Sequence, residues 1–152
     1  MRELWIKLKP QSYDDMLKMI GFAHSTKVWN NNGEWRYDEH KMSLREIPAF
    51  REDVFQLIAE HLRKKGIYDA GLAYEVAEKV WRGCYSKTGQ MDEETILSMF
   101  RLDIDKEYIF FLEEVNYMFP KAQGVANLRE AIRMMFYKNN FKEEYKKIIL
   151  GK

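Results

Sequence analysis

The chain has 152 residues, and its 25 lysines and arginines nearly balance its 24 aspartates and glutamates, which leaves a formal charge of +1. This length predicts one domain, and an apolar fraction of 46% with 14% aromatic residues is typical of a folded globular protein. The balanced charge excludes a global field that would attract nucleic acid, so any nucleic-acid contact would need a local basic patch.

Sites that depend on particular residue types are scarce. The single cysteine, Cys84, excludes an internal disulfide, and the three histidines are far apart in the sequence, so we expect no metal site and a cytoplasmic location. No segment reaches the roughly 18 apolar residues of a membrane span, so we expect no membrane contact. The sequence also lacks a glycine-rich phosphate loop, a nucleophile elbow and an HExxH pattern, and we expect no catalytic residues.

The first quarter of the chain predicts an arm, a helix and a loop. Residues 1–11 alternate briefly between apolar and polar, which indicates a short strand or an extended arm. Ser12 and Asp15 form a variant of the capping box, and the apolar spacing predicts a helix that runs to about Gly21. Residues 23–41 lose this periodicity but contain large aromatic side chains, for which packing is favoured over binding: Trp29, Trp35 and Tyr37.

The middle of the chain predicts a pair of helices. After a short turn at residues 43–47, Pro48 is expected to open a helix that ends at the basic run of residues 63–65 before Gly66. The basic run suits the end of a helix and is also a candidate phosphate patch. Asp69 is expected to begin the next helix, which Gly83 stops.

The last third predicts further helices. They are expected to begin at Asp92, at Asp103 or Asp105, and after Pro120, with a short final helix after residue 140. The two carboxylates of residues 103–105 could in principle face Mg²⁺, but helix capping is the favoured interpretation. The sequence therefore predicts an all-α fold of about six or seven packed helices over residues 12–152.

Cationic side chains become denser toward the end of the chain. Lys121 follows Pro120, so it is expected beside the amides of a helix N-terminus, where phosphates bind readily. Arg129 and Arg133 lie four residues apart and would share one helix face, which suits phosphate contact. A solvated surface explains them equally well, because acidic residues interrupt the patch. His24 is interpreted as a hydrogen-bonding loop residue.

Three stretches, in the same order, resemble the fingers region of the PolC-type alpha subunits of bacterial DNA polymerase III. Residues 21–29, GFAHSTKVW, resemble the pattern GLSHGTDVW of that family. Residues 51–53 and 72–83, RED and LAYEVAEKVWRG, are similar to its run RDDIM…LAFKIMEFVRKG. Residues 117–126, YMFPKAQGVA, resemble YMFPKAHAAA and are the most specific of the three. The resemblance extends over roughly residues 12–141.

The resemblance implies a module of DNA replication whose helices hold an incoming nucleoside triphosphate and the template strand. Lys121 and Arg133 would then face phosphates. Gln123 and Asn127 stand where the family has a histidine and a tyrosine near the nascent base pair, and loss of an aromatic ring removes about 1–3 kcal/mol of stacking per base. The complete set of expected nucleotide- or DNA-binding residues is His24, Lys27, Lys121, Gln123, Asn127, Arg129 and Arg133. Of these, Lys27 replaces an aspartate of the family. Gly124, which lies between Gln123 and Asn127, replaces an alanine.

The resemblance also places polymerase catalysis elsewhere. The palm carboxylates that hold the metal ions for phosphoryl transfer precede the resembling region in the family. We therefore expect no activity from this chain alone and no bound cofactor, because Mg²⁺ would need a palm domain elsewhere. Three hypotheses remain open. The first is a fingers-like module that binds DNA or nucleotide, or docks on a polymerase palm or another replication protein. The others are a protein-interaction domain that has lost nucleotide binding, and one half of a split polymerase.

Overall fold

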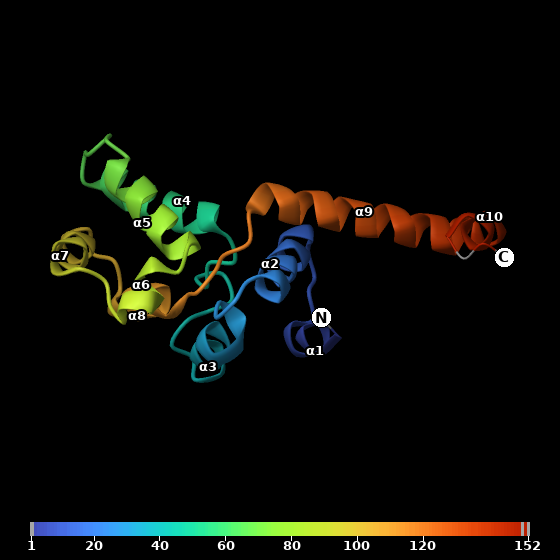
Figure 1. Ribbon diagram of the computed structural model, residues 1–152, viewed down its shortest axis with the longest axis horizontal. Helices are drawn as coiled ribbons and strands as arrows, with labels where there is room; N and C mark the ends of the chain where they lie inside the picture. Colours follow the sequence, from blue (N-terminus) through green and yellow to red (C-terminus); the bar gives the residue numbers. More distant parts are fainter. Residues whose placement is uncertain (1, 150, 152) are drawn as a thin grey trace.

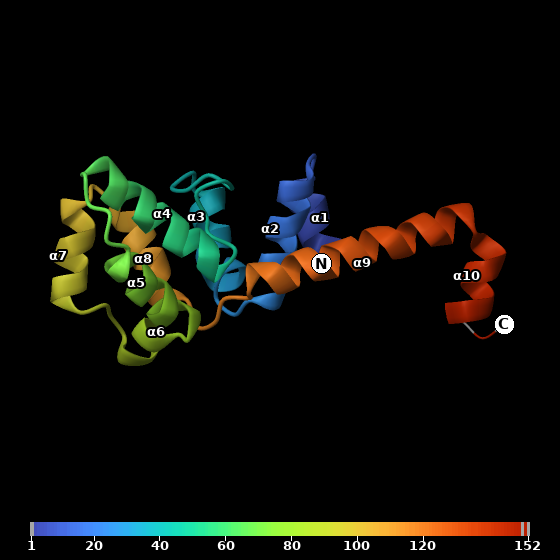
Figure 2. The same ribbon diagram turned by 90° about the horizontal axis from the view of Figure 1, so that it is seen from above.

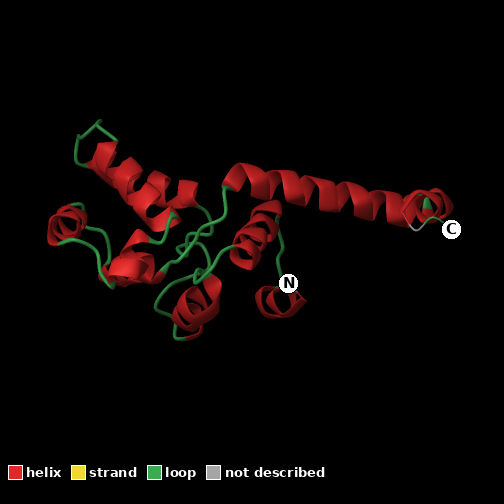
Figure 3. Ribbon diagram, viewed as in Figure 1, coloured by secondary structure: helices red, strands yellow, loops and turns green. Residues whose placement is uncertain are grey.

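The computed structural model describes residues 2–149 and 151, and these residues are largely helical (Figure 3). Within that range the extended pairings are two isolated bridges, between Thr26 and Tyr117 and between Phe50 and Phe119. The predicted all-α, single-domain fold is confirmed. None of the helices in the described part of the chain is both long and apolar enough to cross a membrane.

Ten α-helices and one irregular turn, η1, lie within the described residues. In chain order they are α1 (Arg2–Leu8), α2 (Tyr13–His24), η1 (Trp29–Gly33), α3 (Glu34–Asp38), α4 (Arg51–Lys64), α5 (Gly71–Trp81), α6 (Cys84–Thr88), α7 (Glu93–Arg101), α8 (Lys106–Glu114), α9 (Lys121–Asn140) and α10 (Lys142–Ile149). Figures 1 and 2 show a body formed by α1 to α8, from which α9 extends outward with α10 turned back at its far end. Helix α4 packs against α5, and α2 packs against α9.

Local sequence signals set most helix boundaries where they were expected. Ser12 accepts a hydrogen bond from the Asp15 amide and Asp15 caps in return, so the predicted capping box is confirmed. The Asp92 side chain accepts from the Thr95 amide at 2.9 Å, and the Asp105 side chain accepts from the Glu107 amide at 2.7 Å. Asp103 forms an ion pair with Lys65 instead. Of these two carboxylates, Asp105 caps α8, as the favoured interpretation predicted, and Asp103 forms an ion pair.

Three short helices explain why the count exceeds the predicted six or seven. Residues 2–8 form helix α1, so the expected strand or extended arm is wrong there. Lys7 of α1 forms ion pairs with Glu34 and Asp38 of α3 at 2.9 and 2.6 Å, and these tertiary contacts hold both short helices to the body. Helix α6 follows Gly83. Helices this short are not stable alone, so they leave little periodic signal in the sequence.

Helix α4 begins at Arg51, so the prediction that Pro48 opens it is wrong. The Asp53 carboxylate accepts hydrogen bonds from the amides of Ala49 and Phe50 at 3.0 and 3.2 Å, which fixes those residues just ahead of the first turn. Pro48 lies buried in the preceding segment. The helix ends before Gly66, whose φ of +76° confirms the predicted glycine stop.

The segment before α9 crosses the middle of the body. The Thr26 amide donates to the Tyr117 carbonyl at 2.9 Å, and the Phe119 amide donates to the Ser25 hydroxyl at 2.9 Å. The Met118 side chain, between these two residues, is fully buried. The Met118 amide donates to the Trp81 carbonyl at 3.4 Å, so the segment is hydrogen bonded to two separate parts of the body, which fix the direction in which α9 leaves it.

Helices α2 and α9 both approach the Phe50 ring, which precedes α4, at a glycine. The ring is buried, and a Cβ atom added to Gly21 of α2 or to Gly124 of α9 would lie 2.9 or 2.8 Å from its Cε1 atom. Real Cβ contacts are not that short, so both positions need glycine for this packing. The structure thus gives a reason for Gly124, which was noted above as a departure from the family pattern.

Candidate nucleic-acid interface

Carboxylates of α4 already occupy the N-terminus of α9. The Lys121 amide donates to the Glu52 carboxylate at 3.1 Å, and Lys121 Nζ forms an ion pair with Asp53 Oδ1 at 2.8 Å. A carboxylate at this position satisfies the exposed amide and the helix dipole, as a phosphate would. Lys121 therefore ties α9 to α4, and an incoming anion would have to displace Glu52.

A polar pocket of about 390 Å³ lies beside this contact. It is formed where α2, the turn at residues 44–45, α4 and α9 meet. Its lining carries both signs of charge and consists of Ser12, Asp14, Asp15, Leu17, Lys18, Leu44, Arg45, Phe50, Asp53 and Lys121. Lys121 thus contributes to the pocket, whereas the other residues predicted to bind nucleotide do not line it.

Lys18 is the least expected group in the pocket. Its ammonium donates to the backbone carbonyls of Leu44, Arg45 and Ile47 at 2.8, 2.9 and 2.7 Å. Burial lowers the pKa of Lys18 to about 8, the Asp53 carboxylate opposes that shift, and Lys121 adds to it. The lysine therefore holds the turn before α4 against α2 at the cost of burying a charge.

This pKa gives a pH-dependent stability that can be measured. Lys18 has a pKa of about 8 in the folded chain and an ordinary value of 10.5 when exposed to water, so between these pH values the unfolded chain binds more protons. Its contribution to stability therefore rises with pH across that window. We expect the free energy of unfolding of the wild type, minus that of Lys18→Met, to increase from pH 8 to pH 10.5 in urea titrations. A difference that stays flat or falls would contradict the assignment.

Four of the predicted residues are exposed along α9. At 100° per residue, Gln123 and Asn127 share one face, and Arg129 and Arg133 share another about 120° away around the helix. Arg133 forms an exposed ion pair with Glu130 at 3.0 Å. The helix can therefore present two arginines on one side and two amides on an adjacent side to the same elongated ligand.

His24 and Lys27 lie apart from these four. The His24 ring stacks on Phe119, with the ring centroids 4.8 Å apart, and so covers the segment that leads into α9. Lys27 has a φ of +52° and lines a different depression, together with Ser86, Gly89, Phe110, Glu113 and Glu114. The structure does not bring Lys27 to the start of α9.

Sequence reasoning missed three residues of this region. Glu52 and Asp53 were visible only as part of the resembling RED stretch, and nothing in the sequence showed that they contact Lys121, 68 or more positions further on. Lys18 follows Leu17 in a helix and carries no sign of burial. Within the described residues, no group of histidine, cysteine, aspartate and glutamate side chains is arranged to hold a metal ion.

Comparison with known proteins places this arrangement in context. No protein-family model matches the chain. The DNA polymerase III PolC-type of Clostridium perfringens is 30% identical over 145 residues, which is 95% of this chain and 9% of that protein. The DNA polymerase III PolC-type of Caldanaerobacter subterraneus subsp. tengcongensis is 28% identical over 144 residues, and that of Lactococcus lactis subsp. lactis is 29% identical over 131.

The matches are long with respect to this chain and short with respect to its relatives. They cover 86–95% of the chain, so they include most of α9, but the chain spans only 8–10% of the length of those three relatives. The likeness is shared by PolC-type relatives from several bacteria. The chain is therefore homologous to one segment, about a tenth of the length, of the PolC-type DNA polymerase III proteins.

Proposed function

We propose that this chain is a fingers-like module of a PolC-type DNA polymerase and that it binds DNA along the exposed side of α9. The observation that carries the proposal is the pair Arg129 and Arg133, which is solvent-exposed on one face of the helix that follows the most specific resembling stretch. Arginines in this arrangement suit successive phosphates of a nucleic-acid backbone.

The amides on the adjacent face complete the proposed interface. With the arginines on phosphates, Gln123 and Asn127 would lie toward the bases, where their side chains can both donate and accept hydrogen bonds. They offer no aromatic surface, so we expect weak dependence on base stacking. Lys121 acts as a positioning residue in this proposal, because Asp53 already holds its ammonium.

The same contacts favour DNA over a nucleoside triphosphate as the ligand. A triphosphate at the start of α9 would need to replace the Glu52 carboxylate on the Lys121 amide. DNA on the outer side of α9 needs no such displacement. Phosphoryl transfer, in this proposal, belongs to a palm provided elsewhere, whose carboxylates would hold Mg²⁺.

Salt-dependent DNA binding tests the proposal. We expect the chain to bind a primed or single-stranded oligonucleotide in fluorescence anisotropy, and the double variant Arg129→Gln/Arg133→Gln to bind about tenfold more weakly or worse. The negative slope of log K against log salt should become shallower by between about 1 and 2, as expected for the loss of two phosphate contacts.

A matched pair of cations elsewhere serves as the control. Arg63 and Lys64 are exposed at the end of α4, and the variant Arg63→Gln/Lys64→Gln removes the same charge. It should leave the affinity close to that of the wild type. If this control loses binding while the α9 variant keeps it, DNA lies at the basic run of α4. If folded wild-type protein shows no binding at low salt, the DNA proposal is wrong.

A further inference from the structure

The far half of α9 and the whole of α10 stand clear of the body. We call residues 129–149 the α9–α10 projection (Figures 1 and 2). The buried residues of α9 are Gly124 and Leu128, and none of α10 is buried. Beyond Leu128 the described residues up to 149 are exposed, apart from a half-buried Tyr145. A helical pair with so little packing gains little stability from tertiary contacts.

An apolar cleft lies between the two helices of the projection. Its volume is about 420 Å³, and its lining is Met134, Tyr137, Phe141, Glu144, Tyr145, Ile148 and Ile149. Ile148 is 79% exposed and Tyr137 is 49% exposed, although both are apolar or largely so. Phe136, Tyr137 and Phe141 lie with ring centroids 5.7–6.0 Å apart and support one wall. Glu144 is the one charged side chain in the lining.

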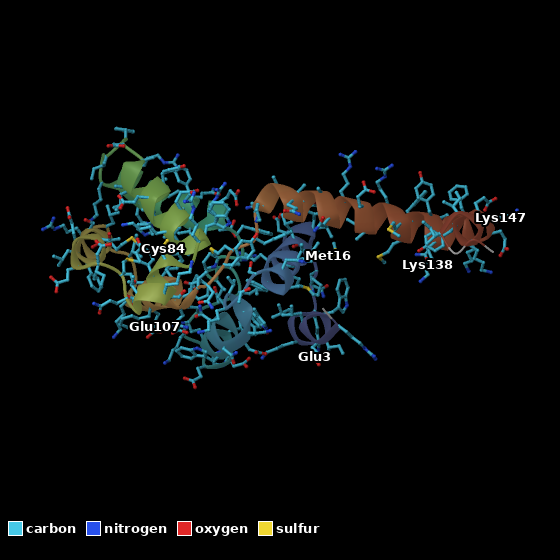
Figure 4. The ribbon with its side chains drawn as sticks, viewed as in Figure 1. Glu3, Met16, Cys84, Glu107, Lys138 and Lys147 are labelled. Atoms are coloured by element: carbon cyan, nitrogen blue, oxygen red, sulfur yellow. The ribbon has the colours of Figure 1, made fainter. Side chains whose placement is uncertain are left out.

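The projection that carries the cleft is basic, and we call the four lysines next to lining residues in the sequence the basic rim: Lys138, Lys142, Lys146 and Lys147. The projection carries six arginines and lysines against three glutamates, whereas the rest of the chain carries more acids than bases. Two of the lysines, Lys138 and Lys147, lie near the far end of the projection in Figure 4. Within the described residues neither they nor Lys142 form an ion pair, so their charge is available to a partner.

We propose that this cleft binds an amphipathic helix of another protein chain, with an apolar face and acidic flanks. Residues 134, 137, 141, 145 and 148 recur at helical spacing along two helices, which is the pattern that receives the apolar face of a third helix. The basic rim would pair with carboxylates on the flanks of the incoming helix and would select against basic partners. This proposal does not depend on DNA binding by Arg129 and Arg133.

The charge and the lining also decide against other occupants. A second copy of the chain would bring a second basic rim against the first, and like charges oppose that contact. DNA would satisfy the lysines, but it would cover aliphatic side chains such as Met134 and Ile148 without burying them in an apolar partner. An acidic amphipathic helix satisfies both features together.

Two synthetic peptides test the proposal on the full chain. Each has about four helical turns and the same leucine spacing; one carries glutamates on its flanks and the other carries lysines. Isothermal titration calorimetry should show the glutamate peptide binding at least about tenfold more tightly than the lysine peptide. Ile148→Asp should weaken that binding by at least about tenfold, because it buries a carboxylate against the leucine face of the peptide.

An exposed isoleucine on the body provides the matched control. Ile67 is 44% exposed after α4, and Ile67→Asp should leave peptide binding unchanged. Circular dichroism checks that both variants stay folded. Equal affinity for both peptides, or no binding of either, would overturn the proposal. Dimerisation in sedimentation that Ile148→Asp abolishes would assign the cleft to a second copy. Displacement of the peptide by an oligonucleotide from the Arg129→Gln/Arg133→Gln variant would assign it to nucleic acid, and either result also overturns the proposal.

Discussion

Replacing Gly83 with alanine should lower the free energy of unfolding by about 3 kcal/mol. Gly83 has a φ of +62°, a left-handed conformation that costs a residue with a Cβ roughly 1–2 kcal/mol. In addition, the new Cβ would lie 2.2 Å from the backbone oxygen of Asn116. The Asn116 amide is itself bonded to the Thr26 carbonyl, so this backbone cannot move without disturbing the segment that crosses the body. Overpacking of this kind costs about 1–3 kcal/mol more.

Gly66 separates the two causes. It also has a positive φ, +76°, but a Cβ added there would meet nothing within 4 Å. Gly66→Ala should therefore cost only the conformational part, about 1 kcal/mol. Urea unfolding of the two variants measures the difference. If Gly83→Ala and Gly66→Ala lose the same stability, the close approach to Asn116 is not a source of strain.

Removing Arg36 should cost about 3 kcal/mol, because it leaves the buried oxygens of Asn32 without their donor and removes the ion pairs to Glu107 and Glu114. The guanidinium is 1% exposed, and it binds Asn32, lies 3.0 Å from Glu114 and 3.7 Å from Glu107, and stacks on Trp35. Arg36→Met keeps most of the side-chain volume and removes these polar contacts. Arg36→Lys should lose less, since it keeps the charge but not the planar fork.

An exposed arginine pair shows how much of this effect depends on burial. Arg133 contacts Glu130 at 3.0 Å, the same distance as Arg36 to Glu114, but both side chains of the Arg133 pair are exposed. Arg133→Met should change the free energy of unfolding by less than about 1 kcal/mol. Thermal and urea unfolding of the two methionine variants make the comparison. Similar losses in both would show that the Arg36 network contributes no more than a surface contact.

The parts of the fold that sequence alone predicted are those set by neighbours in the chain. The capping box at Ser12 and Asp15, the cap at Asp92 and the glycine stop at Gly66 each act within a few residues, so their patterns are legible in the sequence. Helices α1, α3 and α6 were missed because contacts such as Lys7 with Glu34 and Asp38 hold them, and those partners lie 27 and 31 residues away.

In the candidate site, too, features set by neighbours in the chain were predicted and features set by tertiary contacts were not. Helical spacing correctly put Arg129 and Arg133 on one exposed face of α9. It could not show that Glu52 and Asp53 would meet Lys121, because that contact depends on how α4 packs beside the start of α9. A lysine after a proline was therefore interpreted as open to phosphate, whereas tertiary structure supplies it with two carboxylates.

Helix α9 is attached to the body only near its start, so a small rotation there moves its far end a long way. The helix has 20 residues, so at 1.5 Å per residue it is about 30 Å long, and its contacts with the body are confined to its first turns. A rotation of about 10° at Lys121 would therefore carry the far end through about 5 Å, while moving the first turn very little. The Glu52 and Asp53 contacts at the start of α9 thus set where the cleft near the tip and the arginines midway along the helix lie relative to the body.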